Sequence, residues 1–285
     1  MNKLTVPFKN RVYTFEFPDS WDECTYKQLA AVAPKLQGWK DLFAKYQDAT
    51  GATKALLDAE LQEARSRALF ILVGLKPWHI FRKRAFFSMY PDEVADCLKA
   101  INFLFTKMDR TEPPLAYFKW AGKTFFGPGK SFSKITGSEF HFSAEALKKG
   151  DLAMLLAIHY RPRGQENKHD PLHVHFCGDI RAPFNRERLE MDTERFRSTD
   201  KKLLSAFAFF WHGYRLRLSA KNKHIFSTAN EAKAQDRGWI PIFRALSDKP
   251  INFERVANMR MGRILMELTY RKEEVAEQNR KKPKK

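Results

Sequence analysis

Apolar and polar residues alternate in two short stretches, and each stretch predicts a β-hairpin. The first runs from Leu4 to Phe17 around a turn at Lys9–Asn10. The second runs from Tyr117 to Phe126 around Ala121–Gly122. Because successive side chains of a strand point to opposite faces, each hairpin would have one apolar face to bury.

Over most of the chain, apolar residues instead recur every three or four positions, which is typical of amphipathic helices. Proline, glycine and capping residues mark where several of these helices begin and end. The predicted helices cover Tyr26 to about Ala33, Lys54 to Val73, a segment beginning at Pro91, Thr136 to about Lys148, Leu152 to His159, Leu203 to Leu218, and a last segment from about Asn252 to Leu268.

The stretch from Lys134 to Arg163 is the best punctuated part of the chain. Thr136 and Glu139 have the spacing of a capping box, in which a hydroxyl and a carboxylate satisfy backbone donors at a helix start. Asp151 is a candidate cap for the next helix, and Pro162 would stop it. These features are explained by the needs of two helices and carry no catalytic motif.

We therefore predict a mainly α-helical protein with two small β-hairpins as a minor β component. The proline pair at 113–114 is interpreted as an interruption within one architecture. The predicted parts are an N-terminal β-hairpin at 1–20, a helical region at 21–162 with an inserted hairpin at about 115–128, an irregular basic loop at 163–200, a C-terminal helical region at 201–270 and a basic tail at 271–285.

Composition adds a strong positive charge and an aromatic core to this picture. The chain has 51 Lys and Arg against 33 Asp and Glu, a net charge of +18, which favours an anionic partner such as nucleic acid or an acidic protein surface. Its 25 Phe indicate a core rich in ring packing. The positions expected to pack are Leu152, Leu155, Phe207, Phe210 and Trp211.

The cysteine count and the N-terminus indicate the cytoplasm. Cys24, Cys97 and Cys177 are isolated and odd in number, which argues against a disulfide framework. The N-terminus has no apolar signal core, and no apolar run approaches the length that spans a membrane. We expect a cytoplasmic protein with no membrane contact.

Two glycine-lysine motifs resemble the end of a phosphate-binding loop, but neither satisfies the full pattern. Gly129–Ser131 would need glycine where the chain has Thr124, and Gly122–Thr124 would need it at Tyr117. Both also lie in or beside a predicted hairpin, whereas the phosphate cradle requires a strand that leads directly into a helix. Nucleotide hydrolysis is therefore not expected.

A histidine-rich segment offers a possible zinc site. If the segment is extended, His173, His175 and Cys177 share one face, and imidazole and thiolate are good zinc ligands. Three protein ligands with an open fourth position would be a catalytic arrangement. A fourth protein ligand would come from His169, Asp170 or Asp179. The alternatives are a polar surface loop, or a Cys177 nucleophile activated by a histidine.

Direct binding to nucleic acid is a further alternative. Basic and aromatic residues are interleaved at 181–188, 195–197 and 214–217, which would allow phosphate contacts beside stacked rings. Acidic residues in the same region would repel phosphate: Glu187, Glu190, Asp192 and Glu194. No nucleic-acid-binding motif is visible, and no pair of carboxylates stands out for general acid and base catalysis.

The order of these features resembles a group of tail-assembly or tail-associated proteins of tailed bacteriophages and prophages. The resemblance spans about Trp21 to Leu218. The matching pieces are Trp21 to Leu29, Leu72 to Leu75, Lys134 to Thr136, Leu155 to Pro162 and Phe207 to Phe210.

This resemblance implies a non-enzymatic protein that acts through protein–protein contacts in particle assembly. Its partners would be other phage structural or assembly proteins, with possible DNA contact through the basic surface. It implies no cofactor, and zinc at the histidine-rich segment stays an alternative. The protein would work in the host cytoplasm, with incorporation in the virion as a further alternative. The histidine-rich segment and the high positive net charge are not part of this resemblance.

Overall fold

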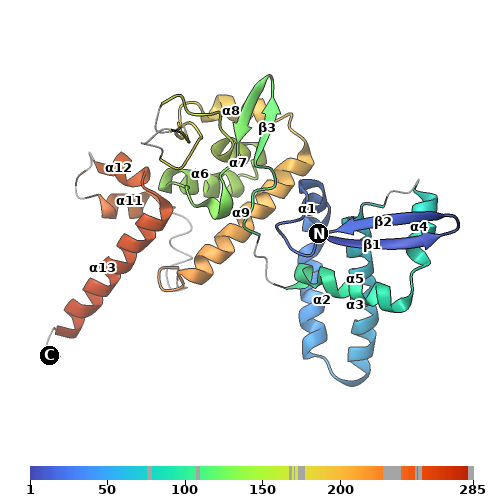
Figure 1. The fold of residues 1–285 in the computed structure, drawn as a ribbon. Helices are drawn as coiled ribbons and strands as arrows, with labels where there is room; N and C mark the ends of the chain where they lie inside the picture. The colour runs from blue at the N-terminus through green and yellow to red at the C-terminus, as the bar shows by residue number, and fades with distance from the viewer. Residues whose placement is uncertain are drawn as a thin grey trace. The chain divides into compact units, whose positions relative to one another are not determined.

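The computed structural model describes residues 1–75, 79–106, 110–166, 169, 171–172, 177–226, 239–247, 249 and 252–281. The chain forms two compact units, each assembled from two segments (Figure 1). Unit 1 comprises Met1–Pro114 and Asp200–Gly213, and unit 2 comprises Leu115–Thr199 and Tyr214–Lys285. Helices make up most of both units, and each has one two-stranded antiparallel sheet, so the predicted fold class is confirmed.

The N-terminal hairpin of unit 1 forms as predicted. β1 (Asn2–Phe8) pairs with β2 (Arg11–Phe17), and the register places Phe8 opposite Arg11 across a two-residue turn. Lys9 has a positive φ of 54°, as the tight turns of two-residue hairpins require. Val6, Phe15 and Phe17 point into the core of unit 1 and are buried.

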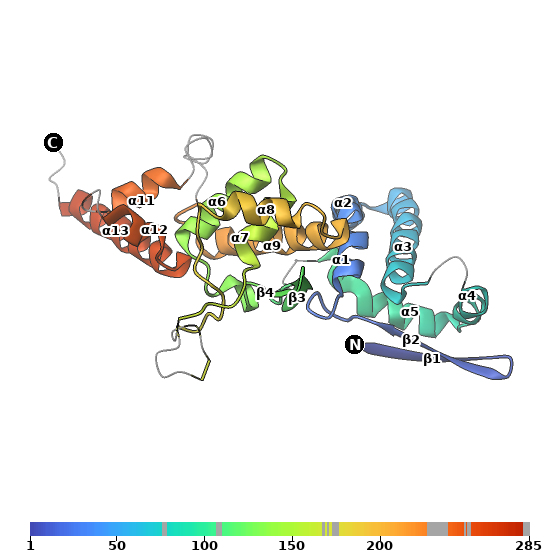
Figure 2. The same ribbon diagram turned by 90° about the horizontal axis from the view of Figure 1, so that it is seen from above.

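The helices of unit 1 surround a core of aromatic and aliphatic side chains. Trp21, Leu29 and Leu72 are almost completely buried in it. α2 and α3 lie side by side and are joined by a short loop, as the views from front and above show (Figures 1 and 2). The helices of unit 1 are α1 (Tyr26–Val32), α2 (Leu36–Asp48), α3 (Gly51–Val73), α4 (Ile80–Phe87), α5 (Pro91–Ala100), the 3₁₀ turns η1 (Ala33–Lys35) and η2 (Ile101–Phe105), and the first part of α9 (Lys201–Lys221).

Local signals set several boundaries in unit 1. α1 begins with the Thr25–Gln28 capping box, and α3 ends at Gly74, which takes the left-handed conformation at φ 68°. Pro34 does not end the helical run, because it occupies the first turn of η1, where its missing amide hydrogen is not needed. α2 and α4 were not among the predicted helices.

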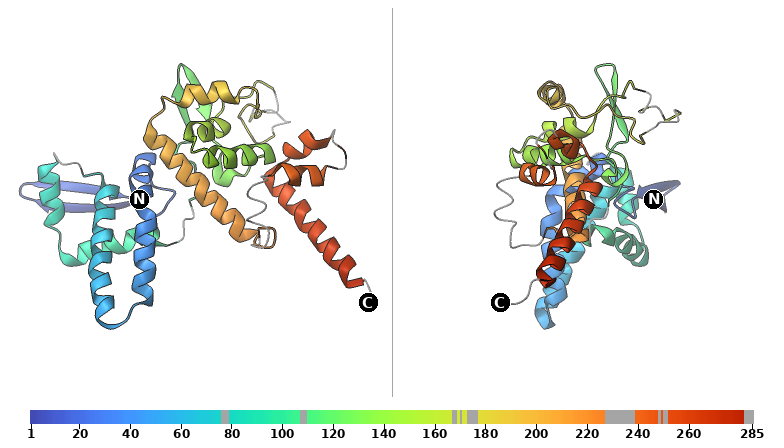
Figure 3. Two further views of the ribbon diagram at one scale, coloured as in Figure 1. Left: turned by 180° about the vertical axis from the view of Figure 1, so that it is seen from behind. Right: turned by 90° about the vertical axis from the view of Figure 1, so that its left-hand side faces the viewer.

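Unit 2 has a hairpin of β3 (Tyr117–Trp120) and β4 (Lys123–Phe126), as predicted, followed by a group of helices. In α6 the capping box of Thr136 and Glu139 is formed, and Asp151 caps α7. The second half of α13 extends beyond α11 and α12 (Figures 1 and 3). The helices are η3 (Lys130–Phe132), α6 (Gly137–Lys148), α7 (Leu152–His159), α8 (Leu189–Phe196), the remainder of α9, α11 (Ile240–Leu246), α12 (Phe253–Ala257) and α13 (Met261–Lys281).

The C-terminal region differs from the prediction in two ways. The single helix expected from about Asn252 is broken at residues 258–260, where the backbone pairs with another segment instead of continuing the helix. α13 then continues to Lys281, into the segment predicted to be a basic tail. α8 and α11 are also helices that the pattern did not predict.

The division into units differs from the predicted single architecture. One boundary falls at Pro114, next to the proline pair that was interpreted as an interruption. The expected packing positions Leu155, Phe207, Phe210 and Trp211 are fully buried, and Leu152 is half-buried. Among the described residues, no helix is both long enough and apolar enough to cross a membrane.

Candidate functional site

Three backbone pairings in unit 2 bring together segments that are far apart in the sequence. Phe126 at the end of β4 pairs with Arg161, and Arg163 pairs with Arg181, so the stretch after α7 lies between two neighbours. Thr136 pairs with Arg260. The first two pairings hold β4, the end of α7 and the segment around Arg181 together, and the third joins the start of α6 to the start of α13.

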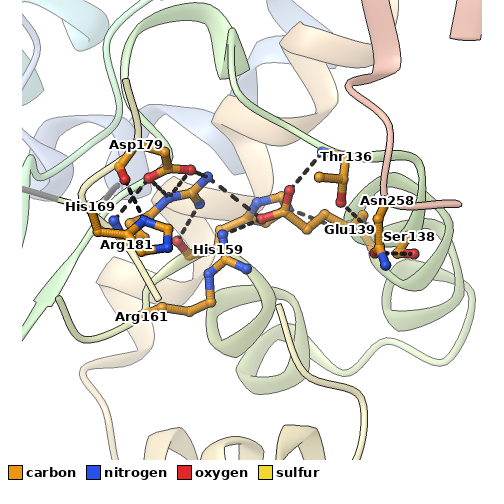
Figure 4. Close-up of polar contacts among 10 residues, drawn as sticks. Thr136, Ser138, Glu139, His159, Arg161, His169, Asp179, Arg181 and Asn258 are labelled. Atoms are coloured by element: carbon orange, nitrogen blue, oxygen red, sulfur yellow. Dashed lines mark hydrogen bonds and ion pairs between the residues drawn. The ribbon is translucent and has the colours of Figure 1, made fainter. Parts of the chain in front are cut away.

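A buried ion network occupies this junction (Figure 4). Oε1 of Glu139, on α6, lies 2.6 Å from Nη2 of Arg161 and 3.5 Å from Nη2 of Arg181. Arg181 also donates two hydrogen bonds to the carboxylate of Asp179, from Nε to Oδ1 at 2.9 Å and from Nη2 to Oδ2 at 2.8 Å. The Glu139 and Arg181 side chains are each 1% exposed, so solvent hardly reaches them. We call Glu139, Arg161, Asp179 and Arg181 the buried ion network.

Two carboxylates balance two guanidinium groups in this network, and the pKa values follow from that balance. Burial opposes the charge of Arg181, but Glu139 and Asp179 outweigh it and raise the pKa of this guanidinium. Burial also opposes ionisation of Asp179, yet Arg181 outweighs it and lowers the pKa of this carboxyl. Burial lowers the pKa of Arg161 to about 10, which leaves it charged at neutral pH. All three groups are therefore ionised.

A buried serine–histidine pair adjoins the network. Nε2 of His159 lies 2.8 Å from Oγ of Ser143, and this hydroxyl donates to the backbone oxygen of Glu139 at 2.6 Å. Burial and then the charges of Arg181 and Arg161 hold the pKa of His159 well below its usual range, so the ring is neutral. Ser143 and His159 are both 0% exposed, so no substrate atom can reach this hydroxyl. Ser143 and His159 therefore form a buried structural hydrogen bond and not an accessible nucleophile and base.

His169 is held beside the network by a close backbone contact. Its Nδ1 lies 2.7 Å from the backbone oxygen of Asp179, and the residue is 5% exposed. A Cβ at Gly164 would come within 2.4 Å of the ring, so only glycine leaves room for it. Within the described residues, Nε2 of His169 has no hydrogen-bond partner.

The predicted zinc ligands are only partly described. His173 and His175 lie outside the described residues, as does Asp170. Sγ of Cys177 is 3.4 Å from the backbone oxygen of Asp179 and 3.7 Å from Nδ1 of His169. In the described ranges, no three His, Cys, Asp or Glu side chains are grouped as metal ligands. The zinc hypothesis, which centres on His173 and His175, therefore stays a prediction.

The structure also places the segments that suggested nucleic-acid binding. Arg181 belongs to the buried ion network, and the rings of Phe196 and Tyr214 are 0% and 8% exposed. Arg195 and Arg197 make ion pairs with neighbouring carboxylates. These rings are therefore not available to stack on bases. The glycine-lysine motif at 129–131 lies at the start of the 3₁₀ turn η3, after a strand but not at the start of an α-helix.

The positive charge is distributed unequally between the units. Unit 2 has 32 Lys and Arg against 18 Asp and Glu, a net charge of +14, whereas unit 1 has 19 against 15, a net charge of +4. Unit 2 therefore accounts for most of the basic character. Unit 1 is close to neutral for its size, so its net charge alone does not favour an anionic partner.

An exposed apolar face lies on α4 of unit 1. Ile80, Phe81 and Phe87 are 57%, 56% and 71% exposed, and Tyr90, just after the helix, is 76% exposed. Residues 80, 84 and 87 follow one another at helical spacing, so Arg84 lies among them on one face. The opposite side, with Ala85 and Phe86, packs into the core. We call Ile80, Phe81, Arg84 and Phe87 the α4 face.

Sequence reasoning missed this face, although a signal was present. The sequence Ile-Phe-Arg-Lys-Arg-Ala-Phe-Phe has apolar residues on more of the helix than one buried stripe can cover. Phe207 and Phe210, which were expected to pack, are buried and leave no apolar surface of their own. Glu139 was predicted only as a capping residue, and its ion pairs depend on segments distant in the sequence.

Comparisons with protein-family models, with curated proteins and with solved structures found no match to this chain.

Proposed function

We propose that this protein acts without catalysis, through protein–protein contacts during the assembly of a tailed-bacteriophage or prophage particle. The observation that supports contact with a partner is the α4 face. Scattered exposed apolar residues are ordinary, but here three large side chains share one helix face with an arginine. Aromatic residues and Arg are enriched in protein interfaces.

The energy available from this face is sufficient to matter for binding. Burying a large apolar side chain completely contributes about 1.5–3 kcal/mol, and Ile80, Phe81 and Phe87 each retain more than half of their surface. Phe87 is also anchored, because its ring lies 5.3 Å from that of Phe70. Anchored aromatic rings lose little conformational freedom on binding.

The buried ion network supports a structural interpretation of the other conspicuous polar residues. Glu139, Arg161 and Arg181 are buried, and the pair of Glu139 with Arg161 joins α6 to the segment after α7. The setting in a phage or prophage particle rests on the resemblance of the sequence. The partners we propose are structural or assembly proteins of that particle, met in the host cytoplasm.

A particle-assembly assay tests this proposal in a lysogen that carries the gene. Phe81→Asp is expected to lower the yield of infective, tailed particles at least tenfold, because it places a charge in the interface. Leu56→Asp is the matched control: Leu56 is a 71% exposed residue on a helix of unit 1, outside the α4 face. Both purified variants should keep the wild-type circular dichroism spectrum.

Two results would count against the proposal. Particle yields that are unchanged in a strain lacking the gene would remove the assembly role. Retardation of DNA in a gel at physiological salt, with a steep loss as salt rises, would favour the nucleic-acid alternative.

A further inference from the structure

Unit 1 contains a groove of about 800 Å³ that lies apart from the α4 face. Its walls come from β2, from α1 and from the C-terminal end of α3, and side chains of α4 and α9 reach its rim. Every one of these segments belongs to unit 1. The groove therefore lies entirely within unit 1.

The floor of the groove is aliphatic. Ile71, Leu72, Val73 and Leu75 line it at the end of α3, with Ala31 from α1. Leu72 is 1% exposed, while its three neighbours are only partly buried and present surface to the groove. This floor suits the side chains of Leu, Ile or Val.

The rim of the groove is positively charged. Lys27, Arg82 and Lys202 are exposed there, and none of them makes an ion pair with a carboxylate in the described part of the chain. The acid on the rim, Glu16, is already paired with Lys3 at 3.0 Å. The C-terminal end of α3 adds about half a negative charge, which is too little to offset three cations.

One wall of the groove is the outer side of a β-strand. Among the described residues, β2 pairs only with β1, and Thr14 and Glu16 of β2 line the groove. The backbone oxygen of Thr14 accepts a hydrogen bond from Nη2 of Arg82 at 3.0 Å, so this edge already binds a donor from the groove side. An unpaired strand edge beside apolar pockets is the arrangement by which domains bind extended peptides.

We propose that this groove binds an extended acidic segment of a partner protein, with aliphatic side chains on the floor and carboxylates at Lys27, Arg82 and Lys202. The inference rests on the proposed function, since it assumes a protein partner, and it names the chemistry of one segment of that partner. Basic rim charges would also speed the encounter with an acidic segment.

A peptide fits this groove better than a nucleic acid does. In the described part of the lining there is no aromatic ring on which a base could stack, and the floor consists of branched aliphatic groups. The strand edge matches the backbone of a peptide, which carries alternating donors and acceptors. Phosphates could pair with Lys27, Arg82 and Lys202, but in the described lining their bases would find no stacking surface.

Fluorescence anisotropy with defined peptides tests the inference on the full-length protein. The probe is a fluorescein-labelled ten-residue peptide of alternating Leu and Asp. It is compared with peptides in which Lys replaces Asp or Ser replaces Leu. We expect the Leu–Asp peptide to bind at least tenfold more tightly than either comparison peptide.

Paired charge reversals localise the binding. Lys27→Glu/Lys202→Glu should weaken binding of the Leu–Asp peptide at least tenfold. Lys45→Glu/Lys54→Glu makes the same change of charge at exposed positions of unit 1 outside the groove, and should alter binding less than twofold. Arg82 is kept intact because its guanidinium also lies 5.4 Å from the ring centre of Phe15.

Absence of binding by the Leu–Asp peptide, or equal weakening by the two double variants, would overturn the inference. So would an equally tight complex with a labelled ten-nucleotide oligothymidine that depends on the same lysines. Phe81→Asp lies outside the groove and should leave peptide binding unchanged. Failure of the groove inference is thereby separated from failure of the assembly role, which the particle assay measures.

Discussion

Replacing Glu139 by glutamine removes one charge from the buried ion network and changes little else. Glutamine has the same shape, and its carbonyl oxygen can still accept the amide hydrogen of Thr136, which Oε2 of Glu139 accepts at 2.7 Å. The helix cap is therefore kept. The new amide NH₂ group faces the guanidinium donors of Arg161 and Arg181, which leaves two buried cations with Asp179 as their remaining carboxylate in the network.

The expected cost follows from the distances and the burial. At an effective dielectric constant of 20, contacts of 2.6 Å and 3.5 Å correspond to about 6 and 5 kcal/mol of gross attraction. Most of this offsets the desolvation of buried ions. Removing one partner of a buried pair typically costs about 3–5 kcal/mol. We expect Glu139→Gln to lower the free energy of unfolding of unit 2 by about that amount.

A second substitution separates lost charge balance from lost packing. Glu139→Gln/Arg161→Met removes one charge of each sign, so Asp179 and Arg181 remain as a balanced pair. Methionine fills much of the volume of the arginine stem without a charge. The double variant should regain at least about 1 kcal/mol relative to Glu139→Gln, because replacing buried ion pairs by apolar groups is often neutral or stabilising.

Urea unfolding followed by circular dichroism measures these differences, with two transitions allowed because the chain has two units. With a slope of about 2 kcal/mol/M, the midpoint of unit 2 should fall by about 1.5–2.5 M in Glu139→Gln. A loss below about 1 kcal/mol would refute the reasoning. A double variant no more stable than Glu139→Gln would show that charge balance is not what the network requires.

Three further predictions concern unit 2 and the core of unit 1. The pKa of His159 is depressed by burial, so below about pH 6.5 the unfolded chain binds a proton that the folded chain does not. The free energy of unfolding therefore decreases as the pH is lowered. His159→Gln should flatten this slope by up to about 1.4 kcal/mol per pH unit, measured by urea titrations between pH 7 and pH 5. Gly137→Ala should destabilise unit 2 by about 1–3 kcal/mol despite the better helix propensity of alanine, because the new Cβ would lie 2.6 Å from Ile264 and 2.9 Å from Phe243; a stabilised variant in thermal unfolding would contradict this. Cys24 should resist a thiol reagent at pH 8 in the native state and react after unfolding, because burial raises its pKa to about 12; rapid native labelling at Cys24, located by peptide mapping, would contradict this.

Elements with local punctuation could be predicted from the sequence. The capping boxes at Thr25 and Thr136 and the glycine stop at Gly74 act through neighbouring backbone groups, so their spacing carries the information. α8 and α11 escaped prediction because they have only 8 and 7 residues, which is too short for an apolar repeat to establish a period.

Features that depend on distant segments could not be predicted. The break between α12 and α13 exists because the amide of Gly137 donates to the oxygen of Met259, and the amide of Met261 donates to that of Ile135. Nothing near Met259 in the sequence announces these bonds. Arg181 likewise has the neighbours expected of an exposed basic residue, and only the fold places its side chain between Glu139 and Asp179.

Each unit is built from two separate segments of the chain, and this limits when each unit can form on the ribosome. The core of unit 1 includes Ala206, so it cannot close until long after Pro114 has been synthesised. Unit 2 needs Met259 and Met261 to complete the backbone pairing at the start of α6. A nascent chain that stops at Thr199 therefore has neither unit complete, and unit 2 cannot be completed before Met261 has been synthesised.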